Sequence, residues 1–246
     1  MYVGLLVWVA VATLLSYIIE RLWSDYTPRR YFRYGLAPGV IMHELSHLAA
    51  CLLTGAEVGR VVLFGPSGGG VEHSRPKMPL LGQPIISLAP IAGCTLALWG
   101  VWWLFSERLD LQLSALPGVE VSATGGMRFW ETLRALFLDA IRQVFSRKFL
   151  SLEGLAFLYL VLTFSIGMAP SRTDLGHALV GLAAIGAIVF LARQTPLADW
   201  EIGAGLSQVV TAFGWRVFTF SILLLMSALA VSIPAAIVGK VFGRSQ

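Results

Sequence analysis

The sequence predicts an all-α polytopic membrane protein with about six transmembrane helices, a small β-hairpin and an amphipathic surface helix. Two measures of composition support this fold class: 57% of the 246 residues are hydrophobic and only 13% are charged. The mean hydropathy is +0.75. Such values are typical of membrane proteins rather than soluble domains. Long uncharged stretches recur along the chain, and polar loops separate them.

The charge and cysteine content limit the partners that the chain is expected to have. A formal net charge of +4 requires no nucleic acid, because basic loops beside anionic lipid account for it. Cys51 and Cys94 lie in apolar runs, so they are expected as small core residues. We expect one membrane domain over 1–246, in the lipid bilayer of a prokaryotic cell membrane. The oligomeric state and the orientation remain open.

The first two predicted spans are 2–19 and 37–54. The first is expected to be a retained helix rather than a cleaved signal peptide, because no basic residue precedes it and no small-residue cleavage site follows. A polar loop rich in arginine and aromatic residues is expected between the two spans, at 20–34. Pro38 suits the first turn of the second span. The four later spans are expected at 80–105, 149–168, 175–192 and 217–241.

Two segments are expected to lie outside the spans. Residues 56–64 favour a strand, the glycine-rich residues 65–70 a turn, and residues 71–73 a returning strand. The resulting hairpin would lie close to 37–54, where its open edge could hold an extended substrate segment. A flexible loop is the alternative.

In residues 126–148 apolar residues recur at helical spacing and charged residues occupy the other faces. This pattern predicts an amphipathic helix on the membrane surface. A lid or a partner surface is the alternative there.

The second span contains a short motif whose side chains could bind a metal and transfer a proton, His43-Glu44-Leu45-Ser46-His47. On a helix His43 and His47 lie one turn apart on one face, so both imidazoles can bind one zinc ion. Glu44 lies beside the metal, where it can take a proton from a zinc-bound water. This is the HExxH pattern of zinc metalloproteases. The alternative is a pair of structural histidines, with Glu44 partnered by an arginine.

A catalytic zinc usually takes three protein ligands, so one more ligand must come from elsewhere in the chain. Asp174 is the first candidate, His177 the second and His73 the third. Asp174 follows a break in the apolar pattern, where Ser171 or Thr173 could cap a new helix, so a first-turn role is its alternative. His177 lies on the same helical face as Asp174 and could instead contact the ligands or the substrate. For His73 the alternative is a solvated loop histidine.

Two motifs together resemble the site-2 protease family of intramembrane zinc metalloproteases. The first is the His-Glu-Leu-Ser-His run at 43–47, inside a membrane helix and followed by a glycine-rich hairpin. The second, at 168–176, is similar to that family's Leu-Asp-Gly motif, which supplies the third ligand. This chain departs from the motif, since it has Thr-Asp-Leu-Gly with one extra residue before the glycine. The resemblance covers about 37–192, the metalloprotease-like core of a minimal, divergent branch.

The resemblance implies an intramembrane zinc metalloprotease that hydrolyses peptide bonds of membrane-embedded helical substrates. One zinc ion per chain would be held by His43, His47 and Asp174, and Glu44 would activate the zinc-bound water. The substrate would be a transmembrane or membrane-anchored protein. The family's asparagine shortly before the aspartate is absent, and its role in holding substrate would have to pass to another residue. The candidates are Ser165, Ser171, Arg172 and His177.

Two other classes of function remain open. A catalytically inactive, protease-like adaptor or chaperone would bind membrane helices, and the missing asparagine motivates this alternative. An ion or proton transporter would use the buried His, Glu and Asp side chains as a relay. The polar residues cluster in two motifs rather than along several spans, which argues against a transporter. Loss of function in Glu44→Gln separates an enzyme from an adaptor.

Overall fold

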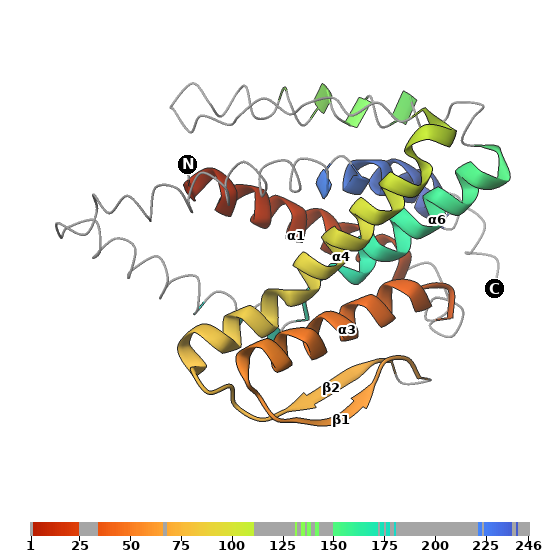
Figure 1. Cartoon of the computed structure of the whole chain (residues 1–246). Helices are drawn as coiled ribbons and strands as arrows, with labels where there is room; N and C mark the ends of the chain where they lie inside the picture. Colours follow the sequence, from red (N-terminus) through yellow and green to blue (C-terminus); the bar gives the residue numbers. More distant parts are fainter. Residues whose placement is uncertain are drawn as a thin grey trace.

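The computed structural model describes residues 2–24, 34–65, 68–110, 131, 134–135, 137–138, 141–142, 150–171, 173–174, 176–177, 180, 221–222, 224–237 and 240. The elements follow in the order α1 (Tyr2–Ser24), α3 (Ala37–Thr54), β1 (Val58–Val62), β2 (Gly70–His73), α4 (Pro79–Leu109) and α6 (Leu152–Gly167). A further apolar helix spans Leu224–Ile237. Figure 1 shows the hairpin lying beside α3, on the side away from α1.

Helix α3 has the bounds that the sequence predicts. Pro38 lies in its first turn, where a missing N–H costs nothing. Gly55 ends the helix in the left-handed conformation, with φ of 68°, and its N–H caps the carbonyls of Cys51 and Leu52. The chain therefore leaves α3 directly into the hairpin.

Two glycines bring the first turn of α3 into backbone contact with the end of α6. A Cβ atom on Gly39 would overlap the carbonyl oxygen of Thr163, and a Cβ atom on Gly167 would lie 2.9 Å from the carbonyl carbon of Gly39. Only glycine permits so close an approach. A similar contact joins α3 to α4, because a Cβ atom on Gly93 would overlap the hydroxyl of Ser46. Helix α3 is thus held closely on two sides.

The hairpin follows α3 as predicted. β1 and β2 pair antiparallel, with Val58 opposite His73 and Val62 opposite Gly70, and an irregularity between Val58 and Val61. Cys51 and Ile86 pack with Ala56 in a small apolar cluster between α3, α4 and the hairpin. This cluster fixes the hairpin against the helix that carries the motif.

The main core lies between α1, α4, α6 and the helix Leu224–Ile237. Its fully buried side chains include Ile19, Leu98, Val161 and Leu225. Cys94 is buried in this core and Cys51 in the small cluster, and both are free thiols, as the apolar runs around them predict.

The prediction of about six transmembrane helices is wrong. In the part of the chain that the structure describes, α4 is the one helix that is long and apolar enough to cross a membrane. A span needs about 20 apolar residues, whereas α6 has 16 because Ser151 caps its start and it ends at Gly167. Leu224–Ile237 is likewise a shorter apolar helix. In α3 the two histidines and Glu44 interrupt the apolar run.

The predicted loop at 20–34 also needs correction at its start. Helix α1 continues to Ser24, and Trp23 donates from its indole nitrogen to the hydroxyl of Ser232, at 2.8 Å. This contact with the C-terminal helix stabilises the last turn of α1, and periodicity within α1 gives no sign of it. The predicted amphipathic helix at 126–148 and the predicted span at 175–192 lie largely outside the described residues.

Candidate metal centre

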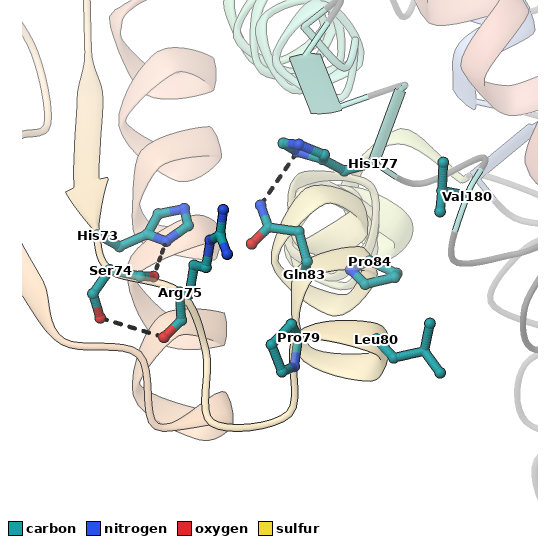
Figure 2. A pocket seen from close by; sticks show the side chains of 9 residues that line it. All are labelled: His73, Ser74, Arg75, Pro79, Leu80, Gln83, Pro84, His177 and Val180. Carbon is teal, nitrogen blue, oxygen red and sulfur yellow. Dashed lines mark hydrogen bonds between the residues drawn. The ribbon is translucent and has the colours of Figure 1, made fainter.

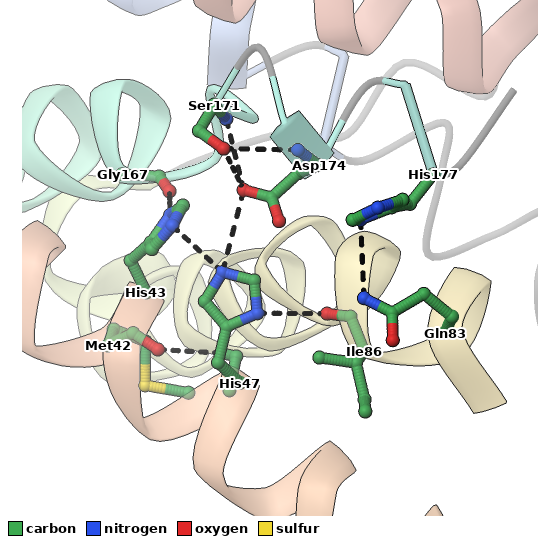
Figure 3. Close-up of polar contacts among 10 residues, drawn as sticks. Met42, His43, His47, Gln83, Ile86, Gly167, Ser171, Asp174 and His177 are labelled. Carbon is green, nitrogen blue, oxygen red and sulfur yellow. Dashed lines mark hydrogen bonds and ion pairs between the residues drawn. The ribbon is translucent and has the colours of Figure 1, made fainter. Parts of the chain in front are cut away.

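Three predicted ligands meet between α3, α4 and the segment after α6. His43, His47 and Asp174 each present one ligand atom, and these atoms all lie within 4.8 Å of one another. The two Nε2 atoms are 3.2 Å apart, and the Nε2 atom of His47 is 3.7 Å from Oδ2 of Asp174. Figure 3 shows both imidazoles directed from α3 toward the carboxylate. All three side chains are partly buried.

The end of α6 orients His43. Its Nδ1 atom donates to the carbonyl of Gly167 at 2.6 Å. That carbonyl is free because α6 ends there, and the last carbonyls of a helix have no partner within the helix. Residue 171 would supply that partner if the helix continued, but its N–H is bonded to Asp174 instead. The close contact of Gly39 with α6, one turn before His43, brings the ring to this carbonyl.

A proline in α4 orients His47. The Nδ1 atom of His47 donates to the carbonyl of Ile86 at 2.9 Å. In a regular helix that carbonyl would accept the N–H of residue 90, four positions later. Residue 90 is Pro90, inside α4, and proline has no N–H. The missing helix bond leaves the Ile86 carbonyl available to the histidine.

These two hydrogen bonds fix the tautomers of the histidines. A carbonyl only accepts, so each Nδ1 atom carries a proton, and in the neutral imidazole each Nε2 atom then keeps a lone pair. Metal-binding histidines characteristically donate their second ring N–H to a carbonyl or carboxylate in this way. Two lone pairs that face each other at 3.2 Å repel, and a cation between them removes the repulsion. A tetrahedral metal ion with bonds of about 2.0–2.1 Å holds two nitrogen ligands about 3.3 Å apart, so the separation of the two Nε2 atoms suits such an ion.

Asp174 combines the two roles that the sequence left as alternatives. The N–H of Asp174 donates to the hydroxyl of Ser171 at 3.1 Å, while Oδ2 accepts from the N–H and the hydroxyl of Ser171 at 3.2 and 2.6 Å. These reciprocal bonds form a capping box at the start of a helix. The same carboxylate lies 3.7 Å from His47. The cap therefore orients the carboxylate toward the histidines.

Glu44 lies outside the ligand cluster, against the hairpin. Its side chain is buried, with 8% exposure, and it touches the turn between the strands. A Cβ atom on Gly69 would lie 2.8 Å from Oε1 and 2.9 Å from Cδ of Glu44. Gly69 of the glycine-rich turn therefore packs against the proposed base.

The remaining candidates lie beside the cluster or outside the described residues. His73 and His177 line a groove whose lining does not include the three ligands, and Figure 3 shows His177 beside Asp174. Ser165 is fully buried in α6. Arg172 lies outside the described residues. In the described part of the chain, only the His43, His47 and Asp174 group could hold a metal ion.

Sequence reasoning missed the two backbone carbonyls that hold the histidines. The available signal for Ile86 was Pro90, since a proline inside a helix frees the carbonyl four residues earlier. The signal for Gly167 was weaker, because it depends on the exact end of α6. Comparisons of this chain with protein-family models, curated proteins and solved structures find no match.

Proposed function

We propose that this protein is a zinc-dependent endopeptidase embedded in the membrane, which hydrolyses peptide bonds of transmembrane or membrane-anchored protein substrates. One zinc ion per chain would bind His43, His47 and Asp174, and Glu44 would act as the base. The resemblance of the 43–47 and 168–176 motifs to site-2 proteases is part of this proposal.

A single observation carries the proposal. Two histidines one turn apart have their Nδ1 protons committed to carbonyls, and their Nε2 atoms face each other at 3.2 Å beside a carboxylate. The three ligand atoms lie within 4.8 Å of one another, and a tetrahedral site with three protein ligands keeps its fourth position for water or substrate.

The metal and the residues around the ligands would have different roles in the reaction. When bound, zinc would supply a Lewis acid that makes water a nucleophile near neutral pH. The Glu44 carboxylate accepts a proton from water and delivers it to the leaving amine as the peptide bond breaks. Contact with Gly69 restricts where this carboxylate can lie.

The proposal also includes that this chain is a multi-pass membrane protein. Helix α4 supports it, as do large apolar side chains that α3, α4 and α6 expose. Leu53 is 86% exposed, Trp103 70% and Leu152 84%. Exposed apolar surface on several helices suits contact with lipid or membrane-embedded partners.

The first experiment is metal analysis of the purified full chain by mass spectrometry. We expect about one zinc ion per chain in the wild type and loss of zinc in His43→Ala and Asp174→Ala. His177→Ala is the matched control, because it removes a nearby imidazole from outside the cluster. A wild-type protein that stays free of zinc when zinc is supplied would contradict the proposal. Zinc that survives Asp174→Ala would move the third ligand to His177 or His73.

Cleavage is tested next, with membrane-helix substrates in proteoliposomes. Glu44→Gln should keep its zinc and lose hydrolysis, because the amide cannot accept the proton. An adaptor would keep its activity in cells with Glu44→Gln. That result would contradict the enzyme and favour the adaptor class.

A further inference from the structure

A groove is lined in part by Gln83 and His177, which Figure 3 shows beside Ile86 and Asp174. It has a volume of about 760 Å³ and is lined by His73, Ser74, Arg75, Pro79, Leu80, Gln83, Pro84, His177 and Val180. This size falls in the range of about 300–1,000 Å³ that is typical of ligand sites. In Figure 2 the end of the hairpin forms one side of the groove, and Gln83 of α4 with His177 forms the other.

The groove and the proposed catalytic site are built on two of the same elements, α4 and the segment after α6. Gln83 lies three residues before Ile86, whose carbonyl holds His47. His177 lies three residues after Asp174, one helical turn along. A hydrogen bond of 3.2 Å from the Gln83 amide to Nδ1 of His177 joins these two elements. An occupant of the groove would therefore lie within about one helical turn of the ligands.

The polar part of the groove favours a negatively charged occupant. Arg75 is exposed and, among the described residues, makes no ion pair. Because Nδ1 of His177 accepts from Gln83, the ring proton of the neutral histidine is on Nε2, a further donor. The described lining residues include no Asp or Glu. Pro79, Leu80 and Val180 complete the lining with apolar surface.

We propose that this groove is a specificity subsite that binds an acidic side chain of the substrate, next to the scissile peptide bond. The inference rests on the proposed protease function. A peptide segment fits better than a lipid, because the groove adjoins the ligand cluster. The apolar residues would contact the neighbouring side chains of a membrane segment, while Arg75 binds the carboxylate in a geometry that suits its planar guanidinium.

The test measures binding, so that it does not depend on cleavage. The full chain with Glu44→Gln is loaded with zinc in detergent. We then measure how tightly it binds fluorescent Leu/Ala-rich peptides. Each peptide carries a single Glu at a different position, and a matched series carries Gln at the same positions. For at least one position we expect Glu to bind about fivefold more tightly than Gln, as for a partly exposed ion pair. Arg75→Gln should bring that ratio to about one.

Lys77→Gln is the matched control. It removes the same charge two residues further along, but Lys77 packs against Gly55 and does not line the groove. The Glu preference should persist in this variant. A ratio of about one at every position, or a preference that survives Arg75→Gln, would overturn the subsite. Competition by phosphatidylglycerol micelles, but not by phosphatidylcholine micelles, that disappears in Arg75→Gln would assign the groove to lipid phosphate and also overturn it.

Failure of the subsite and failure of the protease proposal give different results. A wild-type protein that cleaves Glu and Gln substrates with equal kcat/KM would leave the enzyme standing and overturn the subsite. A protein that binds the Glu peptide through Arg75 and never hydrolyses it would support the subsite and contradict the protease.

Discussion

The two histidines of α3 are held in the same way by two regions that are built differently. His43 donates to a carbonyl at the end of α6, and His47 donates to a carbonyl in the interior of α4. At Gly167 the carbonyl is free because the helix stops. At Ile86 it is free because Pro90 interrupts the hydrogen bonds of a helix that continues. A metal site can therefore obtain the same hydrogen bond from a helix end or from a helix interior.

The difference determines what each region contributes besides orientation. The α6 contact depends on close packing of two backbones at Gly39 and Gly167, so it is part of the fold. The α4 contact depends on one missing N–H group, so the histidine can lose it while α4 stays intact. Damage to the first should affect folding and zinc together, whereas damage to the second should affect zinc alone. The variants below test this difference, in order of their expected effect on zinc binding.

Gly39→Ala should have the largest effect. The added methyl group would overlap the carbonyl oxygen of Thr163, so α3 and α6 must separate. Overpacking of this kind costs about 1–3 kcal/mol, and His43 would lose its acceptor as well. We expect a lower Tm in detergent and loss of most of the bound zinc. Gly100→Ala is the control, because a Cβ atom there meets nothing within 4 Å. An unchanged Tm in Gly39→Ala would contradict the packing role.

Pro90→Ala should reduce zinc affinity without reducing stability. The new N–H can bond to the Ile86 carbonyl, so His47 has to compete for its acceptor. Loss of such a supporting contact typically costs about 10–100-fold in metal affinity, which chelator competition measures. Pro84→Ala is the control, since it removes the other proline inside α4 and leaves the Ile86 carbonyl unchanged. Equal zinc affinities in the two variants would contradict the proposed function of Pro90.

Ser171→Ala should weaken zinc binding by a smaller factor. The variant removes the hydroxyl that donates to Asp174 and accepts from its N–H, but the N–H of residue 171 still donates to the carboxylate. Loss of an N-cap costs about 1 kcal/mol, and we expect zinc affinity to fall severalfold. Ser171→Thr keeps the hydroxyl and should restore most of it. Failure of the threonine to rescue would show that the cap does not position Asp174.

Sequence periodicity and spacing predicted α3 well because its signals are local. Pro38 and Gly55 mark its ends, and the two histidines share a face by their spacing alone. The hairpin was predictable from β-branched residues on either side of a glycine-rich turn. Asp174 was predicted as the first candidate for the third ligand because it follows a break in the apolar pattern, but nothing in its neighbourhood indicates which distant residues it meets.

The errors arose where the structure depends on contacts far apart in the sequence. Apolar length alone cannot distinguish a helix that crosses a membrane from a shorter helix inside a core, and Val161 of α6 is fully buried. Trp23, which lies beyond the predicted end of the first span, meets Ser232, which lies 209 residues away. The close approach of Gly39 to Gly167 joins residues in two helices. None of these pairings follows from periodicity within one helix.

Gly69→Ala should have the smallest effect on zinc, because it leaves both histidine contacts and the Asp174 cap intact. The added methyl group would overlap the Glu44 side chain and displace the proposed base. Displacement of a general base typically costs about 10²–10⁴-fold in rate, so hydrolysis should fall while the zinc content stays at the wild-type value. Gly70→Ala is the neighbouring control, since a Cβ atom there meets nothing within 4 Å. If Gly69→Ala lost zinc as readily as Pro90→Ala, the hairpin would also support zinc binding. The proposal that only the two helix contacts and the Asp174 cap orient the ligands would then be wrong.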